Sequence, residues 1–156
     1  MKKVVVFGAG MVAGAHVEYL LDHGFEVTVA SRTLSKAQEL VKGHAHGHAV
    51  AVNSDDHAAM EEIIRRHDLA VSLLPYVYHP EVAKLCVKHG VHMVTTSYIK
   101  PAMAELDQDA KNAGVILLNE MGVDPGIDHM LAMRVIHKVQ GQGGKITKFV
   151  SWCGGL

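Results

Sequence analysis

Short apolar runs alternate with longer amphipathic segments along most of the chain. Runs of β-branched and aliphatic residues predict buried parallel strands, and apolar residues at every third or fourth position predict helices. The predicted strands cover residues 4–7, 26–31, 49–52, 69–75, 91–96 and 115–118. The predicted helices cover residues 11–23, 34–42, 55–67, 81–89, 101–113 and 130–140, the third of them capped by Ser54 or Asp55. Six strands alternating with helices predict an α/β fold, a doubly wound (Rossmann) parallel sheet with helices on both faces and strand order 3-2-1-4-5-6.

The end of the chain departs from this alternation. A glycine-rich joint at 141–144 precedes the segment 145–153, whose apolar and polar residues alternate as in a strand. That strand has no partner in a finished six-stranded sheet, so we expect it to be the first strand of a missing second domain. The predicted domains are therefore an NAD(P)-binding Rossmann domain at 1–140, then at 141–156 a linker and the first strand of an absent substrate and dimerisation domain.

The first strand runs directly into a glycine turn and a helix. Gly8 permits the tight turn, Gly10 lets the backbone approach a pyrophosphate, and Ala13 lets helix and strand pack closely. Free N–H groups at the helix start, with the helix dipole behind them, would then face the phosphates. The alternative is that these glycines serve strand–helix packing only.

The end of the second strand predicts which dinucleotide is bound. NAD enzymes usually place Asp or Glu there to bond the ribose 2′-hydroxyl, whereas this chain has Ser31, Arg32 and Thr33. Arg32 can pair with a 2′-phosphate through two N–H groups, and the hydroxyls of Ser31 and Thr33 can donate to it. The sequence therefore favours NADP, with NAD as second choice. The alternative is that Thr33 only caps the next helix and Arg32 is solvated.

Composition and charge narrow the class of partner. The net charge of −1 favours neither nucleic acid nor a membrane surface, and no apolar run approaches transmembrane length. Two distant cysteines and the lack of a signal-peptide pattern predict a cytoplasmic protein. The loop 44–48 holds three alternating histidines, but neither cysteine nor carboxylate stands at ligand spacing, so we predict no metal site.

Polar and aromatic residues also follow the later strands, at the sheet edge where ligands bind in this fold. Ser97 and Tyr98 end the fifth strand, and segment 119–129 carries three carboxylates, a histidine and a Pro-Gly turn. Asp124 precedes a proline and is expected to lie in extended backbone. Asp128 faces the cleft in one interpretation and caps the last helix in the other.

Six blocks of this sequence resemble the saccharopine dehydrogenase (L-glutamate-forming) family: GAGMVAG, ASRT, SLLPYVYHP, VTTSYIKPAM, NEMGVDPGIDHMLAM and SWCGGL. The resemblance implies an NADP-dependent oxidoreductase of lysine metabolism that interconverts saccharopine with 2-aminoadipate semialdehyde plus glutamate through an imine. It also implies an amino-acid substrate and a homodimer formed through the absent second domain, so this piece alone is expected to be inactive.

The resemblance also assigns residues. It implies cofactor binding by Gly8, Gly10, Met11, Val12, Ala13, Ser31, Arg32, Thr33, Ser54, Asp55, Leu74, Pro75, Met121, Gly122 and Val123. It implies substrate binding by Ser97, Tyr98, Asp124 and Asp128. The acid–base candidates are Asp124 first, Tyr98 second and Cys153 third, although Cys153 can equally be a small residue that fills a strand end.

Two other functions remain open from the sequence. A related imine reductase, such as a carboxynorspermidine dehydrogenase, would share the Rossmann half and differ in its substrate domain. A non-catalytic NADP-binding module would bind the cofactor without turnover.

Overall fold

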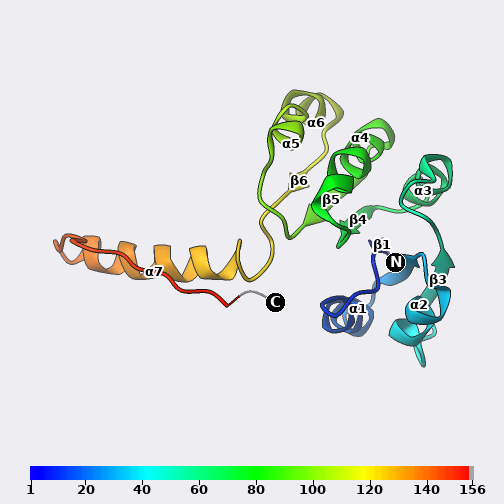
Figure 1. Ribbon diagram of the computed structural model, residues 1–156, viewed down its shortest axis with the longest axis horizontal. Helices are drawn as coiled ribbons and strands as arrows, with labels where there is room; N and C mark the ends of the chain where they lie inside the picture. Colours follow the sequence, from blue (N-terminus) through cyan, green and yellow to red (C-terminus); the bar gives the residue numbers. More distant parts are fainter. Residues whose placement is uncertain (155–156) are drawn as a thin grey trace.

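A six-stranded parallel sheet forms the centre of the protein, in a computed structural model that describes residues 1–154 (Figure 1). Its strands are β1 (Lys3–Phe7), β2 (Glu26–Ser31), β3 (Gly47–Ala51), β4 (Leu69–Ser72), β5 (His92–Thr95) and β6 (Leu117–Leu118). They lie in the order β3-β2-β1-β4-β5-β6, and every neighbouring pair is parallel. The predicted doubly wound topology is therefore confirmed, and the carboxyl ends of all six strands meet at one edge.

Helices connect the strands. They are α1 (Ala13–Asp22), α2 (Leu34–Val41), α3 (His57–Ile64), the 3₁₀ turn η1 (Tyr76–Tyr78), α4 (His79–His89), α5 (Pro101–Ala104), α6 (Asp107–Ala113) and α7 (Ile127–Gly141). The helix predicted over 101–113 is two shorter helices, because the chain turns at Leu106 and buries that side chain in the core. The cap predicted at Ser54 or Asp55 is wrong: the Asp56 carboxylate accepts from Ala59 N over 3.0 Å.

Two apolar cores cover the two faces of the sheet. Alternate residues of β1 point to opposite faces, so Val4 and Val6 pack against α1 and α2, while Val5 and Phe7 pack against α3 and α4. Figure 1 shows α1 and α2 on one side of the sheet and α3 to α6 on the other. This double cover explains why the strands read as continuous apolar runs.

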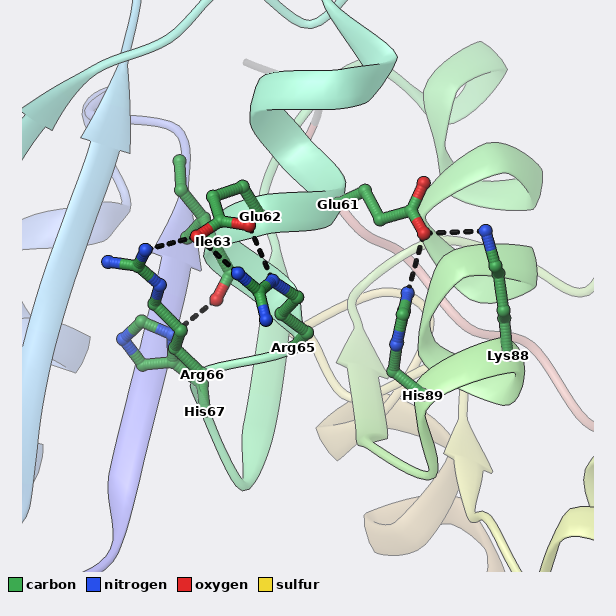
Figure 2. A network of polar contacts seen from close by, with 8 residues as sticks. All are labelled: Glu61, Glu62, Ile63, Arg65, Arg66, His67, Lys88 and His89. Carbon is green, nitrogen blue, oxygen red and sulfur yellow. Dashed lines mark hydrogen bonds and ion pairs between the residues drawn. The ribbon is translucent and has the colours of Figure 1, made fainter.

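Ion pairs join α3 to α4 at the ends of these helices (Figure 2). Glu61 of α3 accepts from Lys88 over 2.5 Å and from His89 over 2.7 Å, both at the end of α4. Glu62 pairs within its own helix region with Arg65 and Arg66. None of these charged residues lines the cavity described below. We therefore assign the ion pairs to the packing of α3 against α4.

The last helix and the segment after it stand apart from the sheet. Helix α7 extends away from the sheet, and the following segment runs back along it (Figure 1). No side chain of α7 is buried against the part of the chain that the structure describes. The strand predicted over 145–153 is not formed, because a strand needs a hydrogen-bonded neighbour and no described residue pairs with this segment. Gly155 and Leu156, the end of the predicted 141–156 unit, lie outside the described residues.

Candidate dinucleotide and substrate site

A cavity of about 350 Å³ opens at the carboxyl edge of the sheet, above β1, β2 and β4. Eight of the predicted cofactor-binding residues line it: Gly8, Gly10, Ser31, Arg32, Thr33, Ser54, Leu74 and Pro75. They come from the four turns that follow β1, β2, β3 and β4, so the fold brings together residues that are distant in sequence. The lining of this cavity includes both the glycine turn, where a pyrophosphate would bind, and the end of β2, where the ribose would bind.

The glycine turn after β1 shows why its two glycines differ. Gly8 has φ +110°, and a Cβ placed there would meet the Leu73 carbonyl oxygen at 3.0 Å. A side chain at Gly8 would therefore be strained and crowded. A Cβ at Gly10 would meet nothing within 4 Å, so this part of the backbone is open to a ligand. Ala13 is fully buried at the start of α1, which agrees with its predicted packing role.

The other end of the cavity carries positive charge. Arg32 follows β2, and Lys36 in the first turn of α2 lines the same space. The hydroxyl of Ser31 accepts from Thr33 N over 3.4 Å, and Thr33 stands at the start of α2 without a capping bond from its side chain. The alternative role of Thr33 as a side-chain cap is therefore not supported. A second hollow leads from Arg32 to Asn53 and Asp56.

The remaining predicted cofactor residues lie outside the lining of this cavity. Met11 and Val12 form the exposed end of the turn before α1, and Met11 is 89% exposed. Asp55 is exposed beside the lining residue Ser54. Met121, Gly122 and Val123 lie after β6, and Met121 N donates to the Thr95 carbonyl over 3.1 Å, which fixes this loop against the end of β5.

Tyr98 and Asp124 meet at this edge of the sheet. The Tyr98 hydroxyl donates to Asp124 Oδ1 over 2.6 Å. The bond to Asp124 raises the pKa of Tyr98 to about 12, because it favours the protonated phenol and the nearby negative charge opposes the phenolate. The two residues predicted first and second as acid–base groups are thus in direct contact.

Cys153 belongs to the same neighbourhood. Desolvation raises the pKa of its thiol, and a hydrogen bond and the charge of Asp124 raise it further. The charge of Asp124 therefore acts on the Cys153 thiol, although the two residues lie far apart in sequence. A thiol with a raised pKa is a proton donor and a poor nucleophile near neutral pH.

Asp128 and His129 complete a small charged cluster at the start of α7. Asp128 Oδ1 accepts from Gly126 N over 3.0 Å and lies 2.7 Å from His129 Nδ1. Desolvation acts to raise the pKa of Asp128, but the bonds from His129 and Gly126 outweigh it and lower that pKa. One donor atom from each of Asp124, Asp128 and His129 lies within 4.8 Å of the others, so these three side chains are the metal-ligating candidates in the described part of the chain.

The alternative prediction, that Asp128 is the N-cap of the last helix, is wrong. Gly126 occupies the N-cap position of α7, and Asp128 lies in the first turn of that helix. Its carboxylate nevertheless binds the N–H of Gly126, so it stabilises the loop that carries Asp124. The Asp124–Pro125 peptide bond in this loop is cis.

Sequence reasoning did not select three residues that the fold places at this edge. Lys36 reads as a solvated helix residue, and its only signal is its spacing of four from Arg32. Glu120 has φ +63° and accepts from Ile99 N over 3.1 Å, so its side chain holds the loop after β5. His79 is buried between the ends of β4 and β5 and contacts Ser97.

The sheet order and the cavity above a glycine turn define a dinucleotide-binding protein of the doubly wound class. Within this class, the chain belongs to the saccharopine dehydrogenase family. Residues 4–118 match the family model of the saccharopine dehydrogenase NADP binding domain. Residues 122–156 match the model of the saccharopine dehydrogenase C-terminal domain.

Relatives of established name cover nearly the whole chain. The saccharopine dehydrogenase [NADP(+), L-glutamate-forming] of Schizosaccharomyces pombe is 48% identical over 100% of this chain and 35% of its own length. The mitochondrial alpha-aminoadipic semialdehyde synthase of Mus musculus is 42% identical over 99% of this chain and 17% of its own length. The chain therefore spans about a third of the fungal relative.

A solved structure agrees with this assignment. The apo saccharopine dehydrogenase (L-Glu forming) of Saccharomyces cerevisiae superimposes with a TM-score of 0.85 and 38% identity, over 92% of this chain and 32% of that one. Within residues 1–154, we find no helix with the length and hydropathy required to cross a bilayer.

Proposed function

We propose that this chain is the cofactor-binding part of an NADP-dependent saccharopine dehydrogenase (L-glutamate-forming). The whole protein would interconvert saccharopine with 2-aminoadipate semialdehyde plus glutamate, a reaction of lysine metabolism. The observation that carries the proposal is the joint placement of the glycine turn, Arg32 and the Tyr98–Asp124 pair at one sheet edge. The names of the relatives support the substrate assignment.

The residues present fit NADP. The open backbone at Gly10 offers N–H groups to a pyrophosphate, and Arg32 and Lys36 offer cations to a 2′-phosphate at the other end of the cavity. Ser54 and the hollow beside Asn53 would receive the adenine, and Leu74 and Pro75 would face the ribose or nicotinamide. The residue that directly follows β2 is Arg32, where NAD-binding proteins usually carry Asp or Glu, and this favours NADP over NAD.

The chemistry divides between cofactor and side chains. When bound, the nicotinamide supplies or accepts the hydride at the carbon of the C–N bond. Asp124 would stabilise the positive charge of a protonated imine nitrogen and would accept a proton from the attacking water. Tyr98, whose raised pKa keeps its proton near neutral pH, donates to Asp124 and would orient it. Cys153 is a further proton donor beside the same carboxylate.

Further parts of the proposal concern the whole protein. We propose a domain boundary near residue 140, at the end of the long helix α7. We also propose that Ser97, Tyr98, Asp124 and Asp128 bind the substrate, and that groups from a second domain help to hold its carboxylates. We propose that this second domain also forms a homodimer, and that the protein is cytoplasmic. Buried Cys86 and exposed Cys153 are both free thiols, which fits a reducing compartment.

The test is turnover by the protein at its full encoded length. We expect NADPH to form when saccharopine and NADP⁺ are supplied, and Asp124→Asn to lower kcat by about a hundredfold or more. Asp22→Asn, at an exposed carboxylate at the end of α1, is the matched control and should leave kcat unchanged. Cofactor binding without saccharopine turnover would contradict the proposal and favour a binding module, and turnover of a different imine would favour another reductase.

A further inference from the structure

A buried histidine links the ends of two central strands to the predicted substrate-binding loop. His79 opens helix α4 and is 2% exposed. Its Nδ1 lies 2.9 Å from the Ser72 hydroxyl, and its Nε2 lies 3.0 Å from Thr95 Oγ1 and 2.9 Å from Ser97 Oγ. Ser72 and Thr95 are register partners at the ends of β4 and β5, so the parallel pairing itself sets this spacing.

The proton of Thr95 decides the direction of these bonds. The Thr95 hydroxyl donates to the Ser72 carbonyl oxygen over 3.0 Å. A hydroxyl has one proton, so Thr95 Oγ1 has only lone pairs to offer to the imidazole. His79 Nε2 must therefore carry a proton that it shares between Thr95 and Ser97, since two lone pairs facing each other at 3.0 Å would repel.

The other ring nitrogen follows from this assignment. A neutral imidazole with a proton on Nε2 has an acceptor at Nδ1, so the Ser72 hydroxyl donates to Nδ1. Burial lowers the pKa of His79 and so favours the neutral ring. The position of His79 in the first turn of α4 acts in the same direction, because the positive end of a helix dipole disfavours an imidazolium.

We infer that His79 is a positioning residue that fixes the Ser97 hydroxyl as a hydrogen-bond donor to the substrate. Because His79 Nε2–H donates to Ser97 Oγ, the proton of Ser97 is not used by the histidine and is directed elsewhere. The backbone of Ser97 is also held, since its carbonyl accepts from Glu120 N over 3.1 Å. The buried network thus holds the Ser97 hydroxyl in place and leaves its proton available to a ligand.

The Ser97 proton needs a hydrogen-bond acceptor on the ligand. The ligand group that suits Ser97 is a carboxylate, which only accepts hydrogen bonds when ionised. This step rests on the proposed function, in which an amino-acid substrate brings carboxylates to the loop of Ser97 and Tyr98. Ser97 would offer its proton to such a carboxylate, and loss of this hydroxyl would remove one hydrogen bond to a charged group.

The tautomer can be measured without turnover. In the full-length protein labelled with ¹⁵N-histidine, nitrogen NMR should show His79 neutral, with Nε2 protonated and Nδ1 unprotonated, near neutral pH. The His79→Gln spectrum identifies which signals are lost. A proton on Nδ1, or a charged ring at neutral pH, would overturn the inference, whatever reaction the protein catalyses.

Kinetics then separates positioning from a merely structural role. We expect His79→Leu to raise KM for saccharopine about tenfold, the loss of one hydrogen bond to a charged group, while the Kd for NADPH stays within about twofold. His79→Gln keeps an N–H donor, so its KM should stay close to that of the unaltered protein. Ser97→Ala should cost much less in the His79→Leu background than in the unaltered protein. Additive effects, or an equal loss in NADPH affinity, would overturn the inference.

Discussion

The Tyr98 hydroxyl donates to Asp124 Oδ1 over 2.6 Å, and the two residues come from loops that follow neighbouring strands β5 and β6. The contact is possible because parallel strands place their carboxyl ends at one edge of the sheet. The Glu120 side chain, which binds Ile99 N, holds the two loops together. Bonds within the chain therefore fix the position of the Tyr98–Asp124 pair.

The Tyr98–Asp124 bond predicts an unusual tyrosine titration. With Asp124 present the pKa of Tyr98 is raised to about 12, and Asp124→Asn should return it toward the ordinary value of about 10, because the negative charge is removed. Ultraviolet absorbance of the phenolate measures the transition, and Tyr98→Phe identifies it among the four tyrosines. An unchanged titration in Asp124→Asn would mean that the bond does not form in solution.

The two glycines of the first turn should behave differently when changed to alanine. Gly8→Ala should destabilise the fold by about 1–3 kcal/mol, since the residue has φ +110° and the new Cβ meets Leu73. Gly10→Ala should change stability by less than about 0.5 kcal/mol, because the space is open, but should weaken NADPH binding. Urea unfolding and NADPH titration of both variants measure this. Equal stability losses would contradict the described geometry.

Lys36 is predicted to act with Arg32 on the 2′-phosphate. Lys36→Ala should weaken NADPH binding and leave NADH binding unchanged, because only NADPH carries the extra phosphate. The loss should be smaller than for Arg32→Ala, since a lysine offers a point charge and not a planar pair of donors. Lys42→Ala, an exposed change at the end of α2, is the control. An equal loss of affinity for both dinucleotides would contradict this prediction, because it would mean that Lys36 does not act on the 2′-phosphate.

One buried and two half-buried histidines predict a loss of stability in mild acid. Burial lowers the pKa of His16, His67 and His79 in the folded protein, so the unfolded chain binds more protons below about pH 6.5. The stabilisation from their neutral rings is present above that pH and is lost as pH falls from there toward the lower folded pKa values. Urea midpoints across this range measure the slope, and His79→Gln should reduce it. A stability that rises on acidification through this range would contradict the prediction.

The sequence predicted the sheet well, because its signals are local and strong. The strand predicted over 26–31 has the observed bounds of β2, and the run after Val4 was correctly assigned to a strand and glycine turn. Strand order followed from the alternation of strands and helices, which is typical of the doubly wound fold. Arg32 was selected because it directly follows the second strand and Ser54 because the resemblance implies it, and both line the cavity.

The rest depended on contacts between distant residues. Nothing near His79 in sequence shows that Thr95 and Ser97 surround it, since that requires the β4–β5 register. The alternation over 145–153 is a strand pattern, but a pattern alone cannot supply the neighbouring strand. Lys36 reads as surface from its helix alone, and only the closeness of β2 and α2 to the cavity gives it a role.

The most direct test of the central claim is a titration of the protein with NADPH and with NADH, with and without Arg32→Ala. The account predicts that NADPH binds at least tenfold tighter, about 1.4 kcal/mol, and that Arg32→Ala removes the difference. Equal affinity for the two dinucleotides, or tighter binding of NADH, would contradict the account and make Arg32 a solvated residue.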